Sequence, residues 1–119
     1  GVSLAINTLL DTTITRIQLT PAQRDSLSVV QQRLREQARG AWMPVAKQLA
    51  SVSAQYDVQD ESQRMNEARA QVIELNVQAV RQARAILTPT QLERLPLELA
   101  RQLTESYVRQ RGAGESIPR

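Results

Sequence analysis

The sequence contains no cysteine and no histidine among its 119 residues. The chain can therefore form no disulfide, and it lacks the thiolate and imidazole groups that most often bind transition metals or act in catalysis. It also shows no glycine-rich phosphate loop, no nucleophile elbow and no carboxylate set spaced for a di-metal centre. We therefore expect a protein that is not an enzyme, with no catalytic residue, no metal site and no cofactor.

Aromatic residues are scarce, with no phenylalanine, one tryptophan and two tyrosines. The core must then be built from Leu, Val, Ile and Ala, which favours thin helix-on-helix packing. The same scarcity removes the stacking platform that single-stranded nucleic acid needs. The net charge is +3, but acidic and basic residues are interleaved, without the block of like charge that is typical of a nucleic-acid-binding arm. We therefore do not expect nucleic acid as a partner.

Long apolar runs are also missing, so we expect no membrane span. A chain of this length is expected to form one domain. It begins at Gly1, without an initiator methionine or a signal-like apolar segment, so we expect either a processed protein or a piece of a longer one.

What the sequence does contain is one phrase that occurs twice, as Leu19-Thr20-Pro21-Ala22-Gln23 and as Leu87-Thr88-Pro89-Thr90-Gln91. The threonine can cap the first turn of a helix, and proline is tolerated at the first helical position. The glutamine, three residues after the threonine, can reach back to close a capping box. Each phrase therefore predicts the start of a helix. The motif residues are Leu19, Thr20, Gln23, Leu87, Thr88 and Gln91.

The first half of the chain shows helical periodicity on both sides of the first phrase. Residues 3–18 predict a short or irregular lead-in helix, weakened by a β-branched stretch. After Thr20 a one-sided apolar stripe predicts a longer helix. Gly40 and Pro44 predict a kink or turn around Trp42 and Met43. These two side chains could form an apolar contact site at the bend, but we favour a core position for Trp42. A second helical stretch follows, with apolar residues at Val45, Leu49, Val52 and Tyr56.

The longest predicted helix covers about residues 60–86 and would run roughly 40 Å, which implies an elongated shape. Its apolar residues occupy an arc of about 200°, about twice the width of a single packing stripe. Two interpretations stay open: part of this arc is left for another chain, or all of it is core within this chain. Four polar residues lie in or beside the arc, namely Asn66, Arg69, Asn76 and Arg84.

The second phrase opens the last predicted helix at Thr88, and Pro96 should bend or split that helix. From Gly112 the sequence loses its periodicity, which predicts a flexible tail. We therefore divide the chain into a lead-in segment (1–18), a helical domain (19–111) and a tail (112–119).

The repeated phrase resembles the Leu-Thr-x-x-Gln motif of the Spy/CpxP family, small periplasmic proteins of the bacterial envelope-stress response. Residues 65–69, Met-Asn-Glu-Ala-Arg, are similar to a Met-x-Glu-x-Arg stretch in the long helix of that family, and residues 85–105 are similar to its closing helix. The resemblance covers Leu19 to about Arg109. It implies an all-α, elongated and curved helical hairpin of four to five helices that pairs antiparallel with a second copy.

The resemblance further implies an ATP-independent periplasmic chaperone that holds unfolded or partly folded proteins on an apolar and basic helical face. We expect that face on the side of the wide arc farthest from Ala68 and Leu75, because this flank is left over if the hairpin covers the other one. The client-binding residues predicted there are Arg69, Ile73, Val77, Val80 and Arg84.

Two alternatives to a chaperone stay open. The same module could be a structural or docking domain of a larger envelope protein or assembly. A ligand-sensing domain would instead need a closed internal pocket. In the chaperone and docking cases the expected partner is a protein, and we expect a homodimer or a complex subunit.

Overall fold

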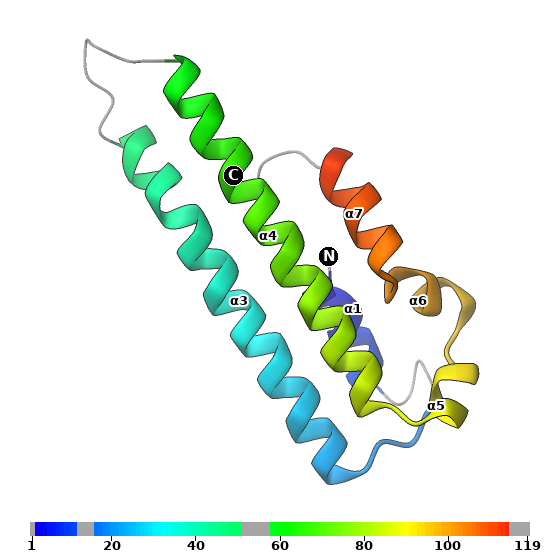
Figure 1. Cartoon of the computed structure of the whole chain (residues 1–119). Helices are drawn as coiled ribbons and strands as arrows, with labels where there is room; N and C mark the ends of the chain where they lie inside the picture. Colours follow the sequence, from blue (N-terminus) through cyan, green and yellow to red (C-terminus); the bar gives the residue numbers. More distant parts are fainter. Residues whose placement is uncertain (1, 12–15, 51–57, 115–119) are drawn as a thin grey trace.

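The computed structural model describes residues 2–11, 16–50 and 58–114 (Figure 1). Every described element of regular structure is an α-helix, which confirms the predicted all-α class. Six helices lie within the described residues, where four to five were predicted. They are α1 (Val2–Leu10), α3 (Pro21–Ala50), α4 (Val58–Ile86), α5 (Pro89–Glu93), α6 (Leu97–Gln102) and α7 (Glu105–Gly114).

The two long helices α3 and α4 form a hairpin, and the four short helices lie beside one part of it (Figure 1). The molecule measures 57 × 25 × 21 Å, with a radius of gyration of 16.8 Å. A compact domain of this length would have a radius of gyration of about 13.5 Å. The elongated shape predicted from the long helix is therefore confirmed. No helix in the described ranges is both long enough and apolar enough to cross a membrane.

The core lies where α1 and the C-terminal helices meet the hairpin. The α1 residues Val2, Ala5, Ile6 and Leu9 are buried because their spacing of three and four places them on one side of the helix. They pack in one cluster with side chains from α3, α4 and the C-terminal helices. Residues 2–10 therefore belong to the same core as the rest of the described chain.

A kink or turn was predicted between Gly40 and Pro44, and the turn is wrong, because α3 continues through both residues to Ala50. Proline removes the hydrogen bond to the carbonyl four residues earlier, which here belongs to Gly40. Both residues are exposed, so water can hydrate that carbonyl and the helix need not end. Val52 and Tyr56, predicted to continue the helical stretch, lie outside the described residues.

The C-terminal third is split at the predicted proline and once more. Pro96 is the residue before the first turn of α6, which confirms the predicted interruption. A second break falls at Leu103 and Thr104, and the Thr104 hydroxyl accepts a hydrogen bond from the Tyr107 amide at 3.3 Å. The helix that follows, α7, continues to Gly114, two residues past the predicted start of the tail, and residues 115–119 lie outside the described residues.

Candidate functional site

Both copies of the repeated phrase form the predicted capping box. In the first copy the Gln23 amide donates to the Thr20 hydroxyl at 3.1 Å, and the Thr20 amide donates to Gln23 Oε1 at 2.9 Å. In the second copy the same two bonds join Gln91 and Thr88 at 3.2 and 2.9 Å. The two phrases therefore fix the starts of α3 and α5 by the same local chemistry.

The two capping glutamines also bind each other. Gln23 Nε2 donates to Gln91 Oε1 at 2.7 Å, and Gln91 Nε2 donates to Gln23 Oε1 at 3.1 Å. Each amide also donates to the backbone carbonyl just before the other phrase: Gln23 to Ile86 at 3.1 Å and Gln91 to Gln18 at 2.8 Å. We call this reciprocal pair, Gln23 and Gln91, the glutamine clasp.

The glutamine clasp uses the full hydrogen-bonding capacity of both side chains. A glutamine amide offers two donors and two acceptor positions, and in both residues all four are occupied. The motif leucines beside the clasp are covered, since Leu19 is half-buried and Leu87 is buried. The sequence predicted each cap but not the pairing of the two caps, so the motif has a structural role that joins the two halves of the chain.

Two of the five predicted client-binding residues are inaccessible. The side chains of Val77 and Val80 are both 0% exposed and lie in the core, so the prediction that they face an open edge is wrong. Ile73 and Arg69 are half-buried. Arg84 is exposed, but its guanidinium donates to the Leu103 carbonyl at 3.1 Å and so anchors the end of α6.

The burial of Val77 and Val80 has a simple geometric cause. The helix α4 packs against α3, α7 and α1, so its wide apolar arc is covered from three directions within the same chain. The wide arc could have been core or a surface for another chain, and the part of α4 that contains these valines is core. The sequence pattern did not locate α1 and α7, and so it could not identify which flank they cover.

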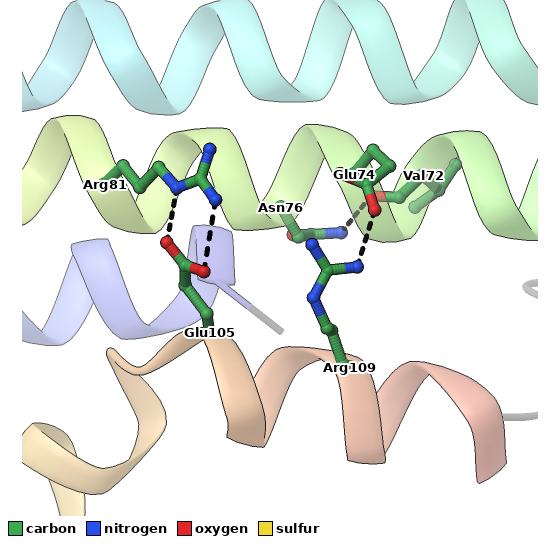
Figure 2. Close-up of polar contacts among 6 residues, drawn as sticks. All are labelled: Val72, Glu74, Asn76, Arg81, Glu105 and Arg109. Atoms are coloured by element: carbon green, nitrogen blue, oxygen red, sulfur yellow. Dashed lines mark hydrogen bonds and ion pairs between the residues drawn. The ribbon is translucent and has the colours of Figure 1, made fainter.

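Two ion pairs join α4 to α7 (Figure 2). Arg81 pairs with Glu105 through Nε and through Nη2, the latter at 3.2 Å from Oε2. Arg109 Nη1 lies 2.6 Å from Glu74 Oε1. The hydrogen bond from Arg109 lowers the pKa of the Glu74 carboxyl, and the hydrogen bond from Arg81 lowers the pKa of the Glu105 carboxyl. Both pairs are exposed, so water and salt weaken them.

The polar side of α4 therefore has a structural role that the sequence did not indicate. Glu74 and Arg81 both hold α7 through hydrogen-bonded ion pairs. The signal available in the sequence was the spacing of these charged residues. Glu74 and Arg81 are seven residues apart, which places them on one line of α4. Glu105 and Arg109 are four residues apart, which places them on one line of α7. Many exposed charges share such spacings, so the signal is weak.

The far end of the α3–α4 hairpin extends beyond α1 and α7 (Figure 1). Near α1, Gln31 and Arg35 of α3 donate to Ser3 of α1, so this side of α3 faces α1. Trp42 lies eleven residues after Gln31, within about 20° of the same line along the helix. Trp42 is half-buried and continues the α1-facing side of α3 past the end of α1.

On α4 the matching positions belong to Ile73 and Arg69. Ile73 lies seven residues before the buried Val80, within about 20° of the same line, and packs partly against the core. Arg69 follows one turn farther toward the end of the hairpin. We call the three half-buried residues Trp42, Arg69 and Ile73 the hairpin face.

The surroundings of the hairpin face are basic. Residues 33–47 of α3 contain four basic side chains and one acidic side chain, which gives this segment a net charge of +3. The acidic residue is Glu36 and the basic residues are Arg33, Arg35, Arg39 and Lys47. Apolar area and positive charge therefore meet on one end of the hairpin.

Within the described ranges, no group of three or more acidic residues is arranged to hold a metal ion. Comparison with known proteins gives no relative: no family model, no curated protein and no solved structure matches the chain. The function proposed below is therefore argued from the residues themselves and from the motif resemblance.

Proposed function

We propose that the protein binds unfolded or partly folded proteins on the hairpin face, as a non-enzymatic and ATP-independent chaperone of the bacterial periplasm. The observation that carries this proposal is the hairpin face itself. It combines the half-buried side chains of Trp42 and Ile73 with that of Arg69 toward the far end of the hairpin.

The chemistry of this face suits weak and exchangeable binding. Half-buried apolar side chains gain free energy when an apolar segment of a client removes them from water. Arginine keeps its charged end hydrated while its aliphatic stem contacts apolar surface. The surplus of positive charge on residues 33–47 attracts acidic segments of a client over some distance, which speeds encounter more than it strengthens binding.

The repeated Leu-Thr-x-x-Gln phrase supports the periplasmic and chaperone parts of the proposal, because it resembles the motif of the Spy/CpxP family. Relative to the residues expected from sequence, the proposed client-binding set keeps Arg69 and Ile73 and adds Trp42. It omits the buried Val77 and Val80, and it omits Arg84 because that side chain anchors α6. We also propose that the protein acts as a homodimer or as a subunit of a complex.

The test compares two double variants in suppressing the aggregation of a denatured protein. Trp42→Glu with Arg69→Glu alters the hairpin face. Arg94→Glu with Gln71→Glu makes the same change in net charge at exposed positions away from the hairpin face, since Arg94 ends α5 and Gln71 lies about 160° around α4 from Arg69. We expect the first variant to lose most of the suppression and the second to keep it. Equal activity of the two variants, both folded, would refute the proposal.

Trp42 offers a direct measurement, because it is the only tryptophan in the chain. Titration with a permanently unfolded polypeptide that lacks tryptophan should shift the fluorescence of Trp42 as the client covers it. A parent protein that shows neither a shift nor any suppression of aggregation would favour the structural or docking domain instead.

A further inference from the structure

The helix α7 is held to the hairpin mainly by surface contacts. Among its described side chains only Val108 is a buried apolar residue, whereas α1, of similar length, buries four. Two exposed ion pairs that Glu105 and Arg109 make with α4 add to this attachment. Contacts of this kind can break and re-form, because water and dissolved ions compete for the same groups.

The ion pairs specify both the direction and the position of the bound helix. We call Glu74, Val77, Arg81 and Arg84 the α7 face of α4, since their spacing places them along one side of the helix. In α7, Glu105 pairs with Arg81, and Arg109, four residues later, pairs with Glu74. If α7 docked parallel to α4, Glu105 would lie near Glu74 and Arg109 near Arg81, so like charges would face each other. The α7 face therefore fits an antiparallel helix with an acid, then an apolar residue, then a base.

The connection to α6 allows α7 to move as a unit. Only Leu103 and Thr104 separate the two helices. Leu103 is fully buried, and its carbonyl is held by Arg84, so the α6 side of the connection is anchored. The hydroxyl of Thr104 accepts from the Tyr107 amide, so α7 carries its own cap. The Thr104 hydroxyl also donates to the Arg101 carbonyl of α6 at 2.8 Å, and the Arg101 guanidinium lies 5.6 Å from the centre of the Tyr107 ring. A pivot near Thr104 must therefore break these two contacts, but it need not unfold either helix.

We infer that the α7 face is an exchangeable docking surface, and that it accepts the α7 helix of a second copy of this chain. A second copy carries the required charges at the required spacing, as the contacts within one chain demonstrate. The chain's own α7 has the advantage of high effective concentration, so exchange between copies prevails only where the contact within one chain is disfavoured relative to the contact between chains. This inference goes beyond the proposed function and stands without it, because exchange requires no client.

The experiment uses two full-length variants with opposite reversals. The first carries Glu74→Arg and Arg81→Glu on α4, and the second carries Glu105→Arg and Arg109→Glu on α7. In either variant alone, both former ion pairs between α4 and α7 become pairs of like charges. Mixed, the α4 of each variant faces a complementary α7 on the other. We expect the two variants to associate in the mixture, with twice the mass of either variant alone in light scattering, and we expect about 1 M NaCl to reverse this association.

Two controls separate exchange from general stickiness. A chain with all four reversals restores complementarity within one molecule, so it should have the same mass as the parent in light scattering and melt like the parent. Glu98→Arg reverses a carboxylate that pairs with Arg101 inside α6, so a mixture of this variant with either reversal variant should show no increase in mass. No increase in mass in the main mixture, together with parent-like folding of the fourfold variant, would overturn the inference.

A milder pair of variants covers the case in which a double reversal alone does not fold. Arg81→Glu and Glu105→Arg each disturb one ion pair and leave the pair of Glu74 with Arg109 in place. These two variants should also associate when mixed, although more weakly. Folded variants that do not associate when mixed would count against exchange in the same way.

Discussion

The helices α1 and α7 have almost the same length and lie against the same hairpin, but different forces hold them. Three large apolar side chains and an alanine of α1 are buried, and its Ser3 and Asn7 accept hydrogen bonds from Gln31. The described part of α7 buries Val108 and adds two exposed ion pairs. The difference teaches that α1 is part of the cooperative core, whereas α7 can open locally while the hairpin stays folded.

The largest expected effect comes from α1. Ile6 is fully buried, so Ile6→Ala should lower the free energy of unfolding by about 2–5 kcal/mol through lost transfer energy and a cavity. Urea unfolding measures this change. Leu4→Ala on the same helix is the matched control, since Leu4 is 66% exposed and its replacement should change stability by less than about 0.5 kcal/mol. Equal effects of the two variants would show that α1 is not part of the core.

The glutamine clasp comes next, because it ties the half of the chain that contains α1 to the half that contains α7. Gln91→Ala should cost about 2 kcal/mol, since it removes a cap and leaves partners of Gln23 without a hydrogen bond. Thr88→Ala removes only a cap and should cost about 1 kcal/mol.

The glutamine clasp also predicts coupling between its two residues. In a double-mutant cycle the effects of Gln23→Ala and Gln91→Ala should fall short of their sum by about 0.5 kcal/mol or more, because the two residues share two hydrogen bonds. Additive effects would mean that the two caps act independently.

A substitution in α7 should have a smaller and more local effect. Val108→Ala should weaken the attachment of α7 by about 1–2 kcal/mol, the value of the apolar groups removed. Hydrogen exchange should then become roughly tenfold faster for α7 amides for each 1.4 kcal/mol lost. The amides of α1 serve as the internal control. Equal acceleration in both helices would mean that α7 opens only when the whole domain unfolds.

The smallest expected effect comes from acid. Hydrogen bonds from arginine lower the pKa of Glu74 and Glu105 from an ordinary value of 4.5. Their contribution to the attachment of α7 is therefore complete above that value and is lost as the pH falls through the lowered pKa. The protection factors of α7 should decrease in this range, while those of α1, which has no ionisable side chain from Val2 to Leu10, should change less. Salt should act in the same direction at neutral pH.

Features that depend on neighbouring residues in the sequence could be predicted. The capping boxes at Thr20 and Thr88, the long helix α4 and the interruption at Pro96 all follow from local chemistry. Pro44 is the instructive exception. Its lost hydrogen bond belongs to an exposed position, and exposure depends on how α3 packs, which the sequence pattern does not give.

Features that depend on packing could not be predicted. Val77 and Val80 lie in an apolar arc that could face a partner or the core, and only the position of the short helices decides between the two. In the same way the capping bonds of Gln23 are local, but its bonds to Gln91 connect residues far apart in the sequence. Ile73 and Arg69, which remain in the proposed site, are half-buried.

The glutamine clasp also has a consequence for the order in which the protein folds. Gln23 and Gln91 are separated by 68 positions, so the clasp can close only after nearly the whole chain is available. The capping box of α3 and the turns of the hairpin require much shorter loops and should form earlier. Substitutions of either glutamine should therefore mainly speed unfolding and leave the folding rate almost unchanged. The clasp would then set how long the finished fold lasts and have little influence on how quickly it is reached.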